Sequence, residues 1–171
     1  MALPRFRLLF APVVLAPLLV GCQPPGGHVG AVATGHFTAL HQFPVVIVTW
    51  CGDAAPRQID LLGETQRRHL VATRAFEGGE IEVDLAAPGD DWEILDEDGR
   101  AVYRMGPDSS EDEYAVGVGS AAAEPGDSAE HDIGTLSFTT GALAAEQGVL
   151  YAGDGTSEAG VVPQEEFPPE C

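Results

Sequence analysis

Short segments of alternating or β-branched apolar residues, separated by turn signals, constrain the fold of this chain most strongly. In the clearest of them, Glu80–Leu85, apolar residues alternate with acidic ones. Such alternation is typical of a half-buried β-strand, because successive side chains point to opposite faces of a sheet. A single helical turn, at 143–147, is the only helix that the pattern suggests. The sequence therefore predicts an all-β fold.

Phe43–Trp50 is strongly β-branched and predicts a central, buried strand. Asp96–Gly99 predicts the turn of a hairpin, because Asp-Gly favours positive φ. Residues 121–132 predict a surface loop, and 161–171 a proline-rich extended segment that runs back to Cys51. The other strands are predicted at 58–62, 69–76, 80–85, 92–95, 101–105, 114–118, 133–140 and 148–152.

These segments make eight or nine short strands, a number that favours an antiparallel β-sandwich, immunoglobulin-like in general build. Trp50, immediately before Cys51, fits the core of such a sandwich, as does Trp92. The cysteine and tryptophan spacing of true immunoglobulin domains is absent, so the prediction concerns architecture and not family.

The first residues have a different character. Arg5 and Arg7 precede an uninterrupted apolar run, Leu8–Val20. This run is too short to span a bilayer, which takes about 20 apolar residues, but it suits the apolar region of a signal peptide. The alternatives are an ordinary secretory signal and an internal transmembrane helix.

The apolar run ends in Leu19-Val20-Gly21-Cys22, which resembles the lipobox of bacterial lipoproteins. The resemblance implies a signal peptide over 1–21, cleavage before Cys22, and diacylglyceryl (palmitate-type) lipid on the Cys22 thiol. Two or three acyl chains give stable membrane anchoring, whereas one is marginal. With no Lys and no Asn, the chain also resembles small uncharacterised lipoproteins of actinobacteria, a resemblance that implies no known activity.

A lipoprotein of this kind has three parts. Residues 22–36, rich in Gly and Pro, are expected to form a flexible tether, with a first strand between Val29 and Phe37 as the alternative. Residues 37–171 are expected to form the single β-sandwich domain. The resemblance places this domain on the extracytoplasmic face of the cell membrane, held by the lipid.

Two cysteines remain once Cys22 carries lipid. An exported, oxidising location favours a disulfide between Cys51 and Cys171. The closed loop would hold about 120 residues, for which chain entropy gives at most about 4 to 5 kcal/mol. Two free thiols, or a mixed disulfide with a partner, are the alternatives.

The charge of the chain limits its partners. With 27 acidic residues against 8 arginines, the net charge is −19, which excludes nucleic acid because phosphate neutralisation needs clustered basic residues. Acidic loops at 90–91, 96–99, 108–113 and 154–158 make calcium the most specific cofactor candidate, although none fits the EF-hand pattern. Solvated acidic turns are the simpler interpretation.

Catalytic patterns are weak. The five histidines, His28, His36, His41, His69 and His131, show no metal-ligand spacing, and no G-x-S-x-G surrounds Ser137 or any other serine. We therefore expect a membrane-anchored, non-catalytic binding or interaction module whose partner is an envelope protein or a small ligand. A calcium-binding structural module is the first alternative and an unrecognised hydrolase the second.

Overall fold

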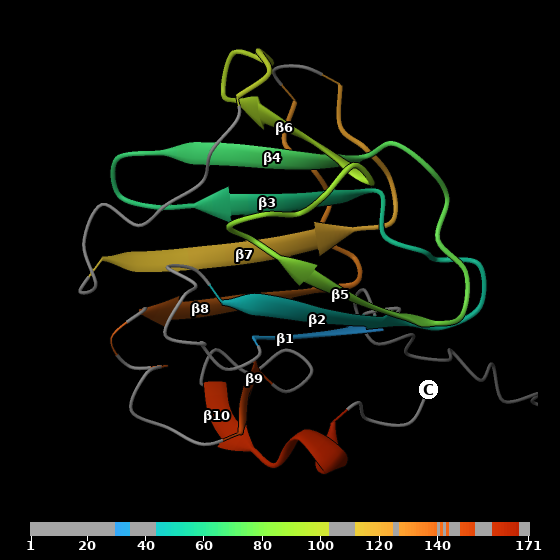
Figure 1. Ribbon diagram of the computed structural model, residues 1–171, viewed down its shortest axis with the longest axis vertical. Coiled ribbons are helices and arrows are strands. Elements are labelled where there is room, and N and C mark those ends of the chain that lie inside the picture. Colours follow the sequence, from blue (N-terminus) through green and yellow to red (C-terminus); the bar gives the residue numbers. More distant parts are fainter. Residues whose placement is uncertain are drawn as a thin grey trace, which may run out of the picture.

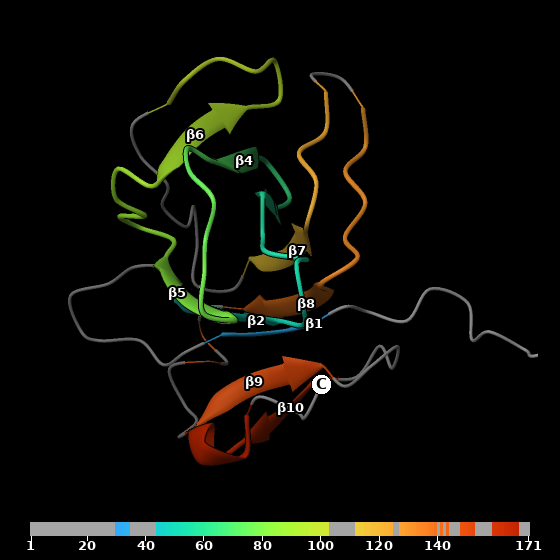
Figure 2. The same ribbon diagram turned by 90° about the vertical axis from the view of Figure 1, so that its right-hand side faces the viewer.

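The computed structural model describes residues 30–34, 44–102, 112–124, 127–139, 141, 143, 148–152 and 159–167. Within them the chain is almost entirely β, and ten strands form two antiparallel five-stranded sheets that face each other (Figures 1 and 2). The prediction of an antiparallel β-sandwich is thereby confirmed. The signal peptide 1–21, the lipid site Cys22 and the terminal Cys171 lie outside the described residues.

The first sheet has the strand order β10-β9-β1-β2-β5. Its strands are β1 (Gly30–Thr34), β2 (Val45–Trp50), β5 (Glu80–Asp84), β9 (Val149–Ala152) and β10 (Ala159–Val162). The second sheet has the order β6-β4-β3-β7-β8. Its strands are β3 (Gln58–Leu62), β4 (Arg67–Ala72), β6 (Trp92–Asp96), β7 (Glu113–Gly119) and β8 (Gly134–Thr139).

The main core lies between the two sheets and is built by the inward residues of each alternating strand. Val46 and Val48 of β2 contribute from the first sheet, and Ile59 and Leu61 of β3 from the second. Trp50 and Trp92 are both buried in this core, as predicted, and Phe76 stacks on Trp92 with a centroid distance of 5.2 Å. The period of two in the sequence thus defines the core faces of the sheets.

Strand β1 corrects the expected domain boundary. Gly30–Thr34 lies within the range assigned to the tether, yet it is the central strand of the first sheet, and Ala31 to Thr34 are buried. Small side chains are the reason: a Cβ on Gly30 would lie 2.1 Å from the carbonyl oxygen of Thr49. The composition that indicates a flexible linker also suits a closely packed strand.

The C-terminal part also differs from the prediction. Instead of one extended segment, it contains β10 and a single turn of 3₁₀ helix, η1 (Gln164–Glu166). Phe167 then packs on the outer face of the first sheet, in a small second cluster with Ala31, Ala33, Ile47 and Val149. The turn at η1 thus allows Phe167 to cover part of this outer apolar face.

The strands near the edge of the second sheet differ from the prediction in one respect and agree with it in another. β4 begins and ends earlier than the predicted 69–76, and Phe76 packs in the core beyond the strand. The hairpin after β6 turns at Asp96–Gly99 as expected, with φ of 76° at Gly99. Its return arm is described only to Val102, with Ala101 bridging to Leu95.

Candidate functional site

A carboxylate lies at the centre of the outer face of the second sheet. Asp60 occupies the middle of β3, between the core residues Ile59 and Leu61, so strand alternation directs its side chain away from the core. Its relative exposure is nevertheless only 4%. An ionised group so well buried needs hydrogen-bond donors to offset its lost hydration.

Two histidines supply such donors, one to each carboxylate oxygen. His69 of β4 has its Nδ1 2.6 Å from Asp60 Oδ1. His131, from the segment before β8, has its Nε2 2.7 Å from Oδ2. Because an ionised carboxylate only accepts hydrogen bonds, both ring nitrogens carry a hydrogen and donate it. Asp60 therefore joins β3 and β4 to a segment 71 residues further along the chain.

Gln58 completes the cluster and links it to the same distant segment. Its Nε2 donates to Asp60 Oδ1 at 2.7 Å, and its Oε1 accepts the backbone N–H of Ala123 at 2.8 Å. Gln58 is 4% exposed, so both of its hydrogen bonds are shielded from water. We refer to residues 120–124 and 127–132 as the covering loop, since they lie over this face.

A glycine makes room for His131. In the cross-strand row of the second sheet, Asp60 pairs with His69 on one side and with Gly117 of β7 on the other. A Cβ on Gly117 would lie 2.5 Å from Cγ of the His131 ring. The imidazole thus occupies the space that a side chain on β7 would take, directly beside the carboxylate.

The electrostatics of the cluster follow from these contacts. Burial raises the pKa of Asp60, but hydrogen bonds from His131, His69 and Gln58 lower it more, and the net pKa lies below its ordinary value. Asp60 is therefore ionised at neutral pH. Its role in the cluster is to accept and orient donors.

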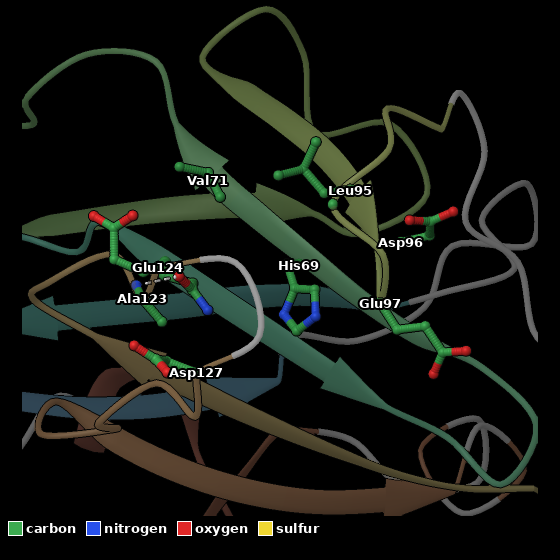
Figure 3. A pocket seen from close by; sticks show the side chains of 10 residues that line it. His69, Val71, Leu95, Asp96, Glu97, Ala123, Glu124 and Asp127 are labelled. Carbon is green, nitrogen blue, oxygen red and sulfur yellow. Dashed lines mark hydrogen bonds between the residues drawn. The ribbon is translucent and has the colours of Figure 1, made fainter.

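Next to this cluster lies a small pocket with a volume of about 60 Å³ (Figure 3). Its base includes Gln58 and His69 of the cluster. Acidic residues line two opposite sides of the pocket. Asp96 and Glu97 of the β6 hairpin lie on one side, and Glu124 and Asp127 of the covering loop lie on the other. The pocket has room for a few waters, but ligand sites for drug-sized molecules need about 300 to 1,000 Å³.

An open groove of about 720 Å³ lies elsewhere, beside β6. Trp92 and Ile94 of β6 line it, together with the loop Ala86–Asp90 that follows β5. Val102, at the end of the described hairpin arm, also contributes. The groove is shaped by the open edge of the sandwich, where the two sheets are not closed onto each other.

The structure bears on the sequence-predicted site residues in part. Cys51, directly after β2, is disulfide-bonded. Its partner lies outside the described residues, so the pairing with Cys171 stays a prediction. His28, His36 and His41 also lie outside the described residues, whereas His69 and His131 meet at Asp60.

The acidic loops use some of their carboxylates for local structure. Asp96 Oδ1 accepts the backbone N–H groups of Asp98 and Arg100, and Asp91 forms a two-fold ion pair with Arg74. Among the residues that the structure describes, no group of three or more His, Cys, Asp or Glu has the arrangement to hold a metal ion. The loop at 154–158, and most of that at 108–113, lie outside this part of the chain.

Sequence reasoning missed Asp60 as a site residue. The sequence predicted only a short strand at 58–62, with no role for this residue. The one available signal was an isolated acidic residue in a short apolar strand, two positions from a glutamine. Only the covering loop, distant in sequence, turns that exposed position into a buried one.

Comparisons with known proteins return no relative: no family model, curated protein or solved structure matches this chain significantly. The described residues also include no helix long and apolar enough to cross a membrane.

Proposed function

We propose that this protein is a lipid-anchored lipoprotein of the extracytoplasmic face of the cell membrane. The lipobox Leu19–Cys22 supports the anchor, and the disulfide-bonded state of Cys51 supports export, because disulfides persist in oxidising compartments. The lipobox carries the proposal, and the disulfide supports the export step independently of that motif. Lipid on Cys22 would hold the sandwich at the membrane, while the acidic surface repels anionic headgroups.

Replacing Cys22 by Ala tests the anchor. We expect the wild-type protein in the membrane fraction, with the mass of an acylated N-terminal peptide that begins at Cys22. The Cys22→Ala variant should lose that mass and leave the membrane fraction after a high-salt wash. Cys51→Ala is the matched control, because it removes a cysteine but no lipid site. A Cys22→Ala variant that stays firmly membrane-bound would refute the anchor.

We further propose that the anchored domain is a non-catalytic interaction module. Two features favour this role over hydrolysis: the pocket beside His69 is small, and Asp60 is already engaged by three hydrogen-bond donors. An envelope protein is the proposed partner, and nucleic acid is excluded by the charge.

Photo-crosslinking in living cells tests the interaction. A photoreactive residue replaces Ala87, which lines the open groove beside β6, and in a matched control it replaces Gly160 on the opposite edge strand β10. The expected result is one dominant crosslinked envelope protein at position 87 and none at position 160. Equal background crosslinking at both positions would count against a partner in the groove.

A further inference from the structure

The groove beside β6 presents apolar surface at the open edge of the sandwich. Its half-buried apolar lining residues are Ala86, Pro88, Ile94 and Val102. Trp92 also lines the groove, and it is 7% exposed and connects this surface to the main core. The groove volume of about 720 Å³ lies within the range of ligand sites, about 300 to 1,000 Å³. Apolar surface that lines such a groove is typical of a site that a partner covers.

The charges along this groove are all negative. Asp90 and Glu93 are its two charged lining residues, and both are exposed. Neither carboxylate forms an ion pair with the residues that the structure describes. The two arginines next to lining residues are each engaged with another acid, in the pairs Arg74–Asp91 and Arg100–Asp98. The groove therefore combines an apolar surface with two uncompensated negative charges.

The openness of the groove favours a segment of a protein over a small molecule. Sites for small molecules bury about 70 to 90% of the ligand surface. Here Ala87, Gly89 and Ala101 line the groove and are themselves exposed, so a small ligand would stay largely in contact with water. A chain segment that passes along the groove can instead use apolar contacts and charged contacts at several points.

A second copy of this chain is a poor occupant. In a two-fold dimer the same surface patch meets itself, so each protomer would bring its own Asp90 and Glu93 to the interface. Each protomer would also bring a net charge of −19. Like charges that are brought together oppose association, whereas a positively charged partner is attracted from a distance.

We propose that the groove beside β6 binds a short segment of a protein partner in which apolar residues are flanked by arginine or lysine. The apolar residues of this segment cover Pro88 and Ile94, and its basic residues pair with Asp90 and Glu93. Arginine suits these carboxylates best, because its planar guanidinium can donate two parallel hydrogen bonds to one of them. This inference rests on the proposed function, since it states the chemistry of the envelope protein that the groove contacts.

Fluorescence anisotropy with the full chain in a nonionic detergent tests the proposal. The probe is a dye-labelled peptide with capped ends, Arg-Val-Thr-Val-Ile-Arg. One comparison peptide has glutamine in place of both arginines, and another has serine in place of valine and isoleucine. We expect saturable binding of the probe and about tenfold weaker binding of the glutamine peptide, the effect of two exposed ion pairs. The serine peptide should show no saturable binding, because it cannot cover the apolar surface.

Paired variants locate the binding. Asp90→Asn, Glu93→Gln removes both charges with little change in size, so it should weaken binding of the probe about tenfold and leave that of the glutamine peptide unchanged. Glu165→Gln, Glu166→Gln is the matched control, because it removes two exposed charges from η1. The control should leave the affinity for the probe unchanged. Equal weakening in the two double variants, or equal affinity for the probe and the glutamine peptide, would overturn the proposal.

The crosslinking experiment at position 87 separates this inference from the proposed function. In the Asp90→Asn, Glu93→Gln background we expect the crosslink to the envelope protein to weaken strongly. An unchanged crosslink would leave the interaction module standing but refute a basic partner, whereas no crosslink in either background counts against the module itself. A dimer of the chain alone in sedimentation, disrupted by Ala87→Arg, would assign the groove to a second copy and also refute the proposal.

Discussion

The space above Gly117 can be tested by filling it with one methyl group. In Gly117→Ala the new Cβ would lie 2.5 to 2.6 Å from Cγ, Cδ2 and Cε1 of His131, about 1 Å closer than ordinary contact. Backbone strain does not arise, since Gly117 does not have positive φ. The ring of His131 must therefore move by about 1 Å, which is enough to break its hydrogen bond to Asp60.

The expected magnitude combines two opposite effects. Loss of the hydrogen bond from His131 to the ionised Asp60 costs about 1.5 to 3 kcal/mol. Alanine in a strand gains about 0.5 to 1 kcal/mol over glycine from the reduced entropy of the unfolded chain. We expect Gly117→Ala to lower the free energy of unfolding by about 1 to 2 kcal/mol, measured by urea denaturation at pH 7.

Two comparisons isolate the cause. Gly160→Ala on β10, where an added Cβ meets nothing within 4 Å, should be neutral or slightly stabilising. In a His131→Ala background the clash is gone, so Gly117→Ala should become stabilising by about 0.5 kcal/mol. If Gly117→Ala costs the same with and without His131, the ring does not occupy this space and the reasoning is refuted.

Three further variants test other parts of the molecule. Asp60→Asn should lower the free energy of unfolding above about pH 5, and the difference from wild type should disappear in acid. The reason is that the pKa of Asp60 is lowered in the folded state. The ionised carboxylate therefore stabilises the fold above the unfolded pKa of about 3.9, and this stabilisation is lost as the pH falls through the folded pKa. Urea titrations from pH 7 to 2 measure this, and an unchanged difference at pH 2 would contradict it. Phe167→Ala should lower the free energy of unfolding by about 2 to 3 kcal/mol, because it uncovers Ile47 and removes the edge contact with Tyr151; no loss in thermal or urea denaturation would mean that the outer face needs no cover. If Cys51 and Cys171 form one bridge, each single Cys→Ser variant and the double variant should lose the same stability, about 3 kcal/mol. The Cys171→Ser variant should also expose one new alkylatable thiol, that of Cys51, on denaturation. The absence of this thiol would disprove the pairing.

The fold was largely predictable because alternation is a local signal. Val83 of β5 and Ile59 of β3 face the core, as their period of two requires. At β1 the structure bears out the alternative of a first strand between Val29 and Phe37 rather than a tether that extends to residue 36. Flexibility was inferred from small residues, and small residues are also what a strand between β2 and β9 requires. Composition cannot distinguish these cases, since the deciding contacts come from elements that are distant in sequence.

The cluster at Asp60 was not predictable for a related reason. Its donors come from β4, from within β3 and from the covering loop, the last of them 71 residues away. A sequence pattern reports the neighbours of a residue along its strand, whereas burial of Asp60 depends on a loop that the same pattern shows only as polar and irregular. The residues were each visible, but their convergence follows from the complete fold.

This dependence on several elements gives the cluster a role in selecting the fold. A slip of β3 by one residue would turn Asp60 to the core face, where Ile59 and Leu61 now pack, and leave a carboxylate without donors. That penalty of several kcal/mol far exceeds what one shifted apolar contact would cost. In the native register the same carboxylate receives three hydrogen bonds, so it favours one register of β3 and one position of the covering loop. Asp60 replaced by a small apolar residue, such as Ala, would thus leave β3 less strictly registered.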